Sequence, residues 1–177
     1  MFGTFADNST RLCKSSCPDG TYADSSTFKC VWTCPTKPLT FGLNVTNECV
    51  TDCPSDRNMY ADNSTRICVL HCSAEDNTYA DPTTRKCVST CPDNYYQVNS
   101  TRTCEMNCPA NEFADPLLRI CVERCSIDPI YYGDPVSWKC LTQCPTTSYG
   151  NPLTQQCVYD VSGVSDCPVN YYSDPTT

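Results

Sequence analysis

The stretch CSAEDNTYADPTTRKCVSTC at residues 72–91 repeats, with small changes, the stretch CPDGTYADSSTFKCVWTC at residues 17–34. Both run from a cysteine through an aromatic–Ala–Asp triplet and a polar turn to Lys-Cys-Val and a further cysteine. About nine copies of this motif make up the 177 residues. Such self-similarity at a short period is the signature of repeat proteins, in which each unit is stabilised by its neighbours.

The composition restricts the class of protein. With 18 cysteines, about one residue in ten is cysteine, which indicates a disulfide scaffold. Disulfides persist in oxidising compartments, so we expect an extracellular protein, at the cell surface or secreted. The formal net charge of −8 argues against a nucleic-acid partner, which favours a basic face. No apolar run approaches the ~20 residues that span a bilayer, and residues 1–10 lack the basic and apolar regions of a signal peptide.

Cysteines set the frame of the repeat. Eight Cys-x-x-x-Cys pairs occur, and a ninth pair, Cys157 and Cys167, has nine residues between its members. The first cysteines of successive pairs are 17 or 19 residues apart. The eight pairs are 13/17, 30/34, 49/53, 68/72, 87/91, 104/108, 121/125 and 140/144.

We number the residues before the first cysteine of each pair backwards, so that position −1 directly precedes that cysteine. At several of these positions the type of residue is nearly constant. Position −6 is usually Asp, position −3 is Thr or Ser in all copies but one, and position −8 is always aromatic. One aromatic in every copy at a fixed register predicts a ladder that stacks hairpin on hairpin, because these rings are the largest apolar area that each copy has. A sugar-binding platform is the alternative. The ladder residues are Phe5, Tyr22, Phe41, Tyr60, Tyr79, Tyr96, Phe113, Tyr132 and Tyr149, continued by Tyr172.

Each copy reads as a β-hairpin. We expect the segment from Cys-Pro to the aromatic to form the first strand, a turn at DPTT, DNST or DSST, and a second strand at RKCV or RICV. Two strands bury too little to be stable alone, so a disulfide must close each hairpin. The predicted fold class is a small disulfide-rich all-β protein: a linear array (a rod or solenoid) of about nine hairpin modules without a large hydrophobic core.

Two disulfide schemes fit the cysteines. Bonding within Cys-x-x-x-Cys is disfavoured, because an extended chain separates the two Cα atoms by roughly 13 Å. An interlaced scheme (13–30 with 17–34, 49–68 with 53–72, ending at 157–167) requires a double-length period, and odd and even copies show no alternation. The other scheme closes one hairpin per bond and is favoured. Its pairs are Cys17–Cys30, Cys34–Cys49, Cys53–Cys68, Cys72–Cys87, Cys91–Cys104, Cys108–Cys121, Cys125–Cys140 and Cys144–Cys157.

The favoured scheme leaves Cys13 and Cys167 to pair with residues outside the chain. The start, GTFADNSTRLC, matches GTYADSSTFKC of the next copy, so the partner of Cys13 is expected just before the first residue. At the other end, Tyr172 predicts a cysteine three residues past the last residue. We therefore expect residues 1–177 to be one continuous array of 17–19-residue repeats, truncated at both ends, with a possible joint at 157–167.

The stretch CVSTCPDNYYQVNSTRTCEMNC at residues 87–108 resembles the single-disulfide β-finger modules in the furin-like, cysteine-rich regions of growth-factor receptors. In those modules Cys-x-x-x-Cys-Pro leads into a finger that the next cysteine closes. The resemblance covers nearly all of the chain and implies one bridge per hairpin. The chain also resembles long cysteine-rich surface proteins of protists, in which such copies run in large numbers. Its uniform copies differ from receptor regions, which mix module types.

Four N-x-[ST] sequons share one position in the repeat. All lie five residues before a hairpin-closing cysteine, at the predicted turn, where an N-glycan fits in a secreted protein. Asn also favours turns for local reasons, which is the alternative explanation. The predicted acceptors are Asn8, Asn44, Asn63 and Asn99.

Metal and catalytic sites have little support in the sequence. Zinc sites favour Cys-x-x-Cys spacing, and every pair here is wider. A calcium loop needs several oxygen ligands, whereas each turn has one Asp. The one histidine, His71, belongs to no nucleophile–base set. We therefore expect no enzyme, no catalytic or metal-binding residue and no cofactor, apart from covalent glycans.

The resulting function hypothesis is a structural extracellular glycoprotein, a repeat segment of a cell-surface or secreted fibre. Its expected partner is itself, as a longer polymer or a laterally associated filament. The alternative is a ligand-binding receptor ectodomain or a surface antigen built from furin-like cysteine-rich repeats.

Overall fold

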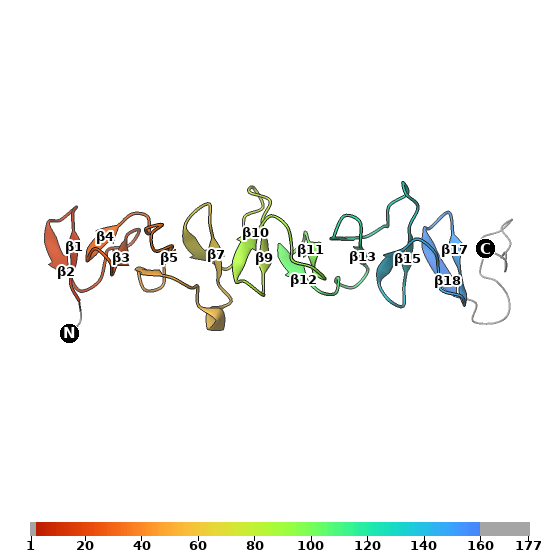
Figure 1. The fold of residues 1–177 in the computed structure, drawn as a ribbon, viewed down its shortest axis with the longest axis horizontal. Coiled ribbons are helices and arrows are strands. Elements are labelled where there is room, and N and C mark those ends of the chain that lie inside the picture. The colour runs from red at the N-terminus through yellow and green to blue at the C-terminus, as the bar shows by residue number, and fades with distance from the viewer. Residues whose placement is uncertain (1–2, 160–177) are drawn as a thin grey trace. The chain divides into compact units, whose positions relative to one another are not determined.

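A computed structural model describes residues 3–159, which form an all-β protein of 18 short strands and one 3-10 turn (Figure 1). The fold class is confirmed: the array consists of about nine hairpin modules, and no large core is present in the described part of the chain. These residues form two compact units, residues 3–90 with 101–103 and residues 91–100 with 104–159. The predicted joint at 157–167 lies mostly outside the described residues.

Strand positions repeat with the sequence. The first ten strands are β1 (Phe5–Asp7), β2 (Leu12–Lys14), β3 (Tyr22–Asp24), β4 (Lys29–Val31), β5 (Phe41–Leu43), β6 (Glu48–Val50), β7 (Tyr60–Asp62), β8 (Ile67–Val69), β9 (Tyr79–Asp81) and β10 (Lys86–Val88). The others are β11 (Tyr96–Val98), β12 (Thr103–Glu105), β13 (Phe113–Asp115), β14 (Ile120–Val122), β15 (Tyr132–Asp134), β16 (Lys139–Leu141), β17 (Ser148–Asn151) and β18 (Gln156–Tyr159). The 3-10 turn η1 covers Ser55–Arg57.

The position expected for the first strand was wrong. In eight of the nine described modules it begins at the aromatic residue and not at Cys-Pro, so its three residues occupy positions −8 to −6, and β17 begins one residue earlier. The Cys-Pro segment forms a loop, in which the backbone N–H of Thr21 donates to the carbonyl of Pro18 at 3.0 Å. This loop absorbs the difference between 17- and 19-residue repeats, because the strands and the tip turns keep their lengths. The two cysteines of a module are accordingly 13 or 15 residues apart.

Each module is an antiparallel hairpin in a constant register. In the first module Phe5 pairs with Lys14, Ala6 with Cys13 and Asp7 with Leu12. The residue at position −7 therefore lies opposite the cysteine that closes the hairpin. Eight disulfides are present, and each closes one hairpin module. Their Cα–Cα distances are 5.5 to 5.6 Å, within the usual range for disulfides. They join the pairs 17–30, 34–49, 53–68, 72–87, 91–104, 108–121, 125–140 and 144–157.

Successive modules are joined by a second, parallel pairing. The first strand of each module bridges the second strand of the next one, as Ala6 does with Lys29 and Gly42 with Ile67. In the first unit the pairs are β1–β4, β3–β6, β5–β8, β7–β10 and β9–β12. In the second unit they are β11–β14, β13–β16 and β15–β18.

Buried apolar side chains form small local clusters. One contains Phe41, Leu43, Met59 and the disulfide Cys53–Cys68, with Val50 packed against it. Each cluster contains residues of one module and of its neighbour. Apolar surface is therefore buried at each junction between modules and not in one shared core. A repeat protein distributes its stability in this way.

Substitution of a glycine at position −7 can show how tightly a junction is packed. A Cβ built on Gly42 would lie 2.5 Å from Cζ of Tyr22 in the preceding module. We expect Gly42→Ala to destabilise the chain by about 1–3 kcal/mol, because the ring must move out of its position. Gly3→Ala is the control, since its Cβ would meet Phe28 at an ordinary 3.8 Å. Thermal unfolding with the disulfides intact measures both, and equal midpoints for the two variants would contradict the packing argument.

Candidate functional site: hairpin tips and module junctions

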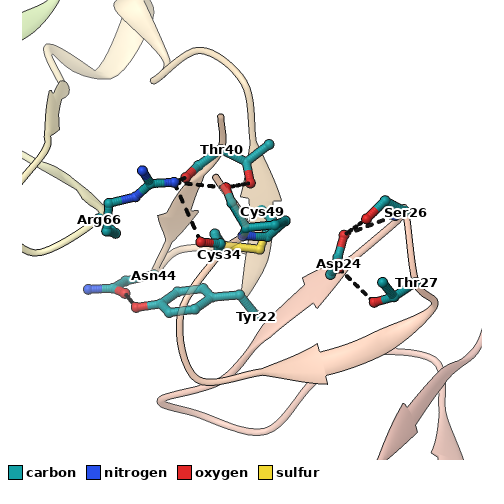
Figure 2. The surroundings of a disulfide bond; sticks show 10 residues. Tyr22, Asp24, Ser26, Thr27, Cys34, Thr40, Asn44, Cys49 and Arg66 are labelled. Atoms are coloured by element: carbon teal, nitrogen blue, oxygen red, sulfur yellow. Dashed lines mark hydrogen bonds between the residues drawn. A yellow bond between two sulfur atoms is a disulfide. The ribbon is translucent and has the colours of Figure 1, made fainter. Parts of the chain in front are cut away.

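Most hairpin tips are organised by the side chain at position −6, which is Asp in six of the nine copies and Asn in a seventh. The carboxylate of Asp81 accepts hydrogen bonds from the backbone N–H of Thr83 at 2.8 Å, its hydroxyl at 2.7 Å and the hydroxyl of Thr84 at 2.6 Å. Asp24 holds Ser26 and Thr27 in the same way (Figure 2). The repeated Ser/Thr residues after Asp therefore supply donors to a carboxylate that is nearly fully buried.

These hydrogen bonds control the ionisation of the tip carboxylates. Burial raises the pKa of Asp24, Asp62 and Asp81, but the hydroxyl and amide donors together outweigh it and lower the pKa below the ordinary 3.8. In the first module the hydrogen bonds from Ser9 and Thr10 lower the pKa of Asp7 to about 2. These four carboxylates therefore keep their negative charge at any physiological pH.

Every tip ends with a residue in the left-handed region at position −2. These residues have φ values of 54° to 62°, and none of them is glycine. In six of these tips the backbone N–H at position −2 donates to the carbonyl at position −6, as Arg85 does to Asp81 at 2.9 Å, which closes a four-residue tip loop. The nine residues are Arg11, Phe28, Asn47, Arg66, Arg85, Arg102, Arg119, Trp138 and Gln155.

The left-handed residue also makes the junction between modules. Its carbonyl accepts a hydrogen bond from the backbone N–H at position −7 of the preceding module, as in Ala61 to Arg85 at 2.8 Å. Eight such bonds of 2.7 to 2.9 Å occur in the described residues. The positive φ turns this carbonyl away from its own hairpin, so one unusual backbone angle serves both the tip and the junction.

The side chain at position −2 then covers the aromatic residue of the preceding module. The guanidinium of Arg85 lies 4.3 Å from the ring centroid of Tyr60, and that of Arg102 lies 4.1 Å from Tyr79. Such cation–π contacts contribute about 0.5–2 kcal/mol each. In Trp138 an indole takes the same place, 5.5 Å from the ring of Phe113.

Polar groups at position −2 also bind carbonyls in the preceding loop. Figure 2 shows Nη2 of Arg66 donating to the carbonyls of Cys34 and Thr40, and it also donates to Pro35 at 2.8 Å. In the same way Nδ2 of Asn47 donates to Cys17 at 3.2 Å. These bonds reach the loop whose length varies between copies and fix it to the next module.

The residues of the aromatic column therefore lie at the junctions. Tyr22, Phe41, Tyr79 and Phe113 are buried, whereas the other described members of the column are half-buried. Each ring whose contacts are resolved lies against position −7 or position −2 of the next module. Tyr172 lies outside the described residues.

All four sequon asparagines are exposed in tip turns, immediately after position −6. Asn44 also bonds to a neighbouring module, because its Oδ1 accepts a 2.5 Å hydrogen bond from the hydroxyl of Tyr22 (Figure 2). Its Nδ2, to which an N-glycan is attached, is the other end of the amide. Other tips have proline in place of asparagine, at Pro82, Pro116, Pro135 and Pro152.

Other candidate groups in the described part of the chain are few. Cys13 is a free and exposed thiol, and Cys167 lies outside the described residues. His71 is exposed beside the Cys72–Cys87 bond. Residues 3–159 contain no cluster of three or more His, Cys, Asp or Glu that could hold a metal ion. Within the same residues, no helix is long and apolar enough to cross a membrane.

Two columns of the repeat were missed in the sequence. Position −7 is Ala or Gly in eight of nine copies, and position −2 is Arg in five. Where position −7 is Gly, the ring of the preceding module lies so close that a Cβ would collide with it, as at Gly42, Gly133 and Gly150. Arg at −2 was taken as part of the second strand, since nothing in a sequence marks a non-glycine residue with positive φ.

The chain is thus a tandem cysteine-rich repeat with one disulfide in each of eight described modules. Comparison with protein-family models, with curated proteins and with solved structures found no match.

The tip carboxylates make the stability of the chain depend on pH. We expect Asp81→Ala to cost about 2 kcal/mol at pH 7, because three hydrogen bonds to a carboxylate are lost. Asp81→Asn should cost less, since Asn151 occupies the same position and its Oδ1 accepts from the N–H of Leu153 and Thr154.

The sign of the pH effect follows from the lowered pKa of Asp81. The carboxylate stabilises the fold fully above the ordinary pKa of 3.8, and this contribution is lost as pH falls below 3.8 through the folded pKa. The difference between the original chain and Asp81→Ala should therefore shrink in acid, as measured by urea unfolding at a series of pH values. A difference that stays constant down to pH 2 would rule out this role of the charge.

Proposed function

We propose that the chain is a structural segment of an extracellular glycoprotein fibre, at the cell surface or secreted. The observation that carries the proposal is the junction, because the same backbone hydrogen bond joins successive modules eight times. A unit that is completed by its neighbour can be added without limit, and this property suits a fibre. No comparable geometry in the described residues points to catalysis.

The disulfides support an oxidising location. Sixteen of the 17 cysteines in residues 3–159 are paired, with one bond in each module but the first. Such a density of bonds is stable outside the reducing cytosol. Each bond closes a loop that has almost no core of its own, and by loop entropy it contributes on the order of 3 kcal/mol. A fibre exposed to proteases benefits from modules that cannot open individually.

Glycans at the tips are the second part of the proposal. Asn8, Asn44, Asn63 and Asn99 are exposed at one position of the repeat. Glycans there would cover the tip side of successive modules and leave the junctions free. The resemblance to furin-like β-fingers, and to long cysteine-rich surface proteins of protists, agrees with a secreted and repeated module.

A receptor ectodomain or a surface antigen is the second candidate. It is favoured by apolar side chains at position −4 of four tips, where the other five have Ser or Thr. One of the four is Val45 in the first unit, and the other three are in the second unit. Leu117, Val136 and Leu153 occupy position −4 and are 56%, 70% and 67% exposed. Exposed apolar groups in a regular register are a feature of binding surfaces.

Electron microscopy separates the two candidates. The fibre proposal expects native, unreduced material to form continuous filaments with an axial repeat, which collapse in a matched sample treated with reductant. The collapse is expected because a two-stranded module without its bond is marginal. Discrete particles without end-to-end order would overturn the fibre proposal and favour the receptor or antigen.

The glycans can be tested independently. We expect the chain, secreted from a host with N-glycosylation, to have four occupied sites by peptide mapping, and to lose one glycan for each of Asn8→Gln, Asn44→Gln, Asn63→Gln and Asn99→Gln. Asn77 is the internal control, since it is exposed but belongs to no sequon. Unmodified asparagines at all four tips would refute the glycan part and leave the fibre proposal standing.

A further inference from the structure

Arg119 is an exception among the arginines at position −2. At three other junctions the guanidinium at this position lies 4.1 to 5.1 Å from the centroid of the preceding ring. Arg119 follows Tyr96 in the same register, but no cation–π contact between the two is found within residues 3–159. Its Nη1 lies 3.2 Å from a carboxylate oxygen of Asp93, and its Nη2 donates to the carbonyl of Cys91 at 3.0 Å. The half-buried ring of Tyr96 is therefore left without this cover.

The hydroxyl of Tyr96 also lacks the partner that the same group has at another junction. There Tyr22 donates to Asn44, which lies at position −5 of the next module. After Tyr96 that position is Pro116, whose side chain has no hydrogen-bonding group. Neither Tyr96 nor Asn94 makes a side-chain hydrogen bond among the described residues, so both groups are available to a ligand.

A second tyrosine, Tyr95, lies beside Tyr96 at position −9. In other modules Thr21, Thr40 and Thr78 occupy this position, and their hydroxyls donate to a carbonyl of the preceding loop at 2.8 to 3.3 Å. Tyr95 closes its loop through the backbone alone, with its N–H donating to Pro92 at 3.1 Å. Its half-buried phenol ring therefore has no part in closing the loop.

These side chains surround a hollow of about 470 Å³ between two adjacent modules of the second unit. A volume in this range is typical of small-molecule sites. The carboxylate of Asp93 is 95% exposed, so that a ligand can enter from solvent. The hollow is lined by Asp93, Asn94, Tyr95, Tyr96, Pro116 and Arg119.

A neutral saccharide fits the chemistry of this hollow. One face of a sugar ring consists of C–H groups that pack on an aromatic side chain, and its hydroxyls pair with carboxylate and amide groups. The carboxylate of Asp93 and the guanidinium of Arg119 already neutralise each other. A charged ligand would have to displace one member of this ion pair, whereas a neutral ligand leaves the pair intact.

We propose that this hollow, the Tyr96 site, binds a neutral saccharide whose ring stacks on Tyr95 and whose hydroxyls bond to Asp93 and Asn94. A free oligosaccharide and a glycan attached to another copy of the chain present the same groups. The site does not depend on the fibre function, because two adjacent modules of one chain form it.

The test uses the full oxidised chain, treated with an endoglycosidase so that no glycan of its own competes, and two variants. Tyr95→Thr introduces the residue that Thr21 and Thr78 provide at the same position, so the loop should keep its fold. Tyr131→Thr makes the same change at position −9 of another module, outside the Tyr96 site. Equal free-thiol counts in the three proteins establish that their disulfides have formed.

Saturation-transfer NMR measures binding of neutral oligosaccharides of glucose, galactose, mannose and N-acetylglucosamine, with sialyllactose as an acidic comparison. We expect at least one neutral oligosaccharide to bind. Tyr95→Thr should weaken that binding roughly tenfold, the equivalent of losing one aromatic contact. Tyr131→Thr should bind as the original chain does.

The identity of the bound oligosaccharide distinguishes the two sources. Binding of chitobiose or of mannose oligomers, which are parts of an N-glycan, would indicate a glycan on another chain. Binding of the glucose or galactose oligomers alone would indicate a free saccharide. Either result supports the Tyr96 site.

The other outcomes each overturn the inference. Absence of binding to every neutral oligosaccharide would show that the hollow is not a saccharide site. Binding that Tyr95→Thr leaves unchanged, or that both variants weaken equally, would place the contact elsewhere. Tighter binding of sialyllactose would show that the ligand is acidic. Each of these results leaves the fibre proposal to the microscopy of native material.

Discussion

The structure depends on one backbone angle, the positive φ at position −2. This angle ends the tip loop, and it also turns a carbonyl outward toward the preceding module. At Arg85 the N–H closes the tip by donating to Asp81, while the carbonyl accepts from Ala61. The residue at position −2 therefore forms both the tip and the junction.

Around this constant backbone, the ring at most junctions is held in one of two ways. Where position −7 is Gly, the preceding ring lies directly over it, as Tyr22 does over Gly42. Where position −7 is Ala, the ring is covered from position −2 instead, as Tyr60 is by Arg85. Phe113 has both, with Gly133 on one side and Trp138 on the other. A ring can therefore contact the next module whether position −7 of that module is Gly or Ala.

Much of this could be predicted from the sequence. Cysteine spacing and the regular repeat predict the hairpins and the fold class, because closure of a short loop leaves few pairings open. The strand boundaries could not be predicted, since Pro18 and its neighbours suit an extended segment as well as the loop that they form. The junction was also missed. Its central bond joins Ala6 to Phe28, and only the three-dimensional register brings those two residues together.

The locality of the junctions also explains which positions are free to vary. Every junction joins a module to the next one, so a substitution acts on one boundary and not on a shared core. Positions −8, −7, −6 and −2 make those boundaries and tips. Positions −5 and −4 are exposed, and position −4 can bond to position −6 through its backbone N–H alone, as Leu117 does to Asp115. At these exposed positions the chain has Asn63 and Ser64 in one tip and Pro116 and Leu117 in another, on the same hairpin. The surface can therefore change from a polar glycan acceptor to an apolar contact while the array beneath it stays the same.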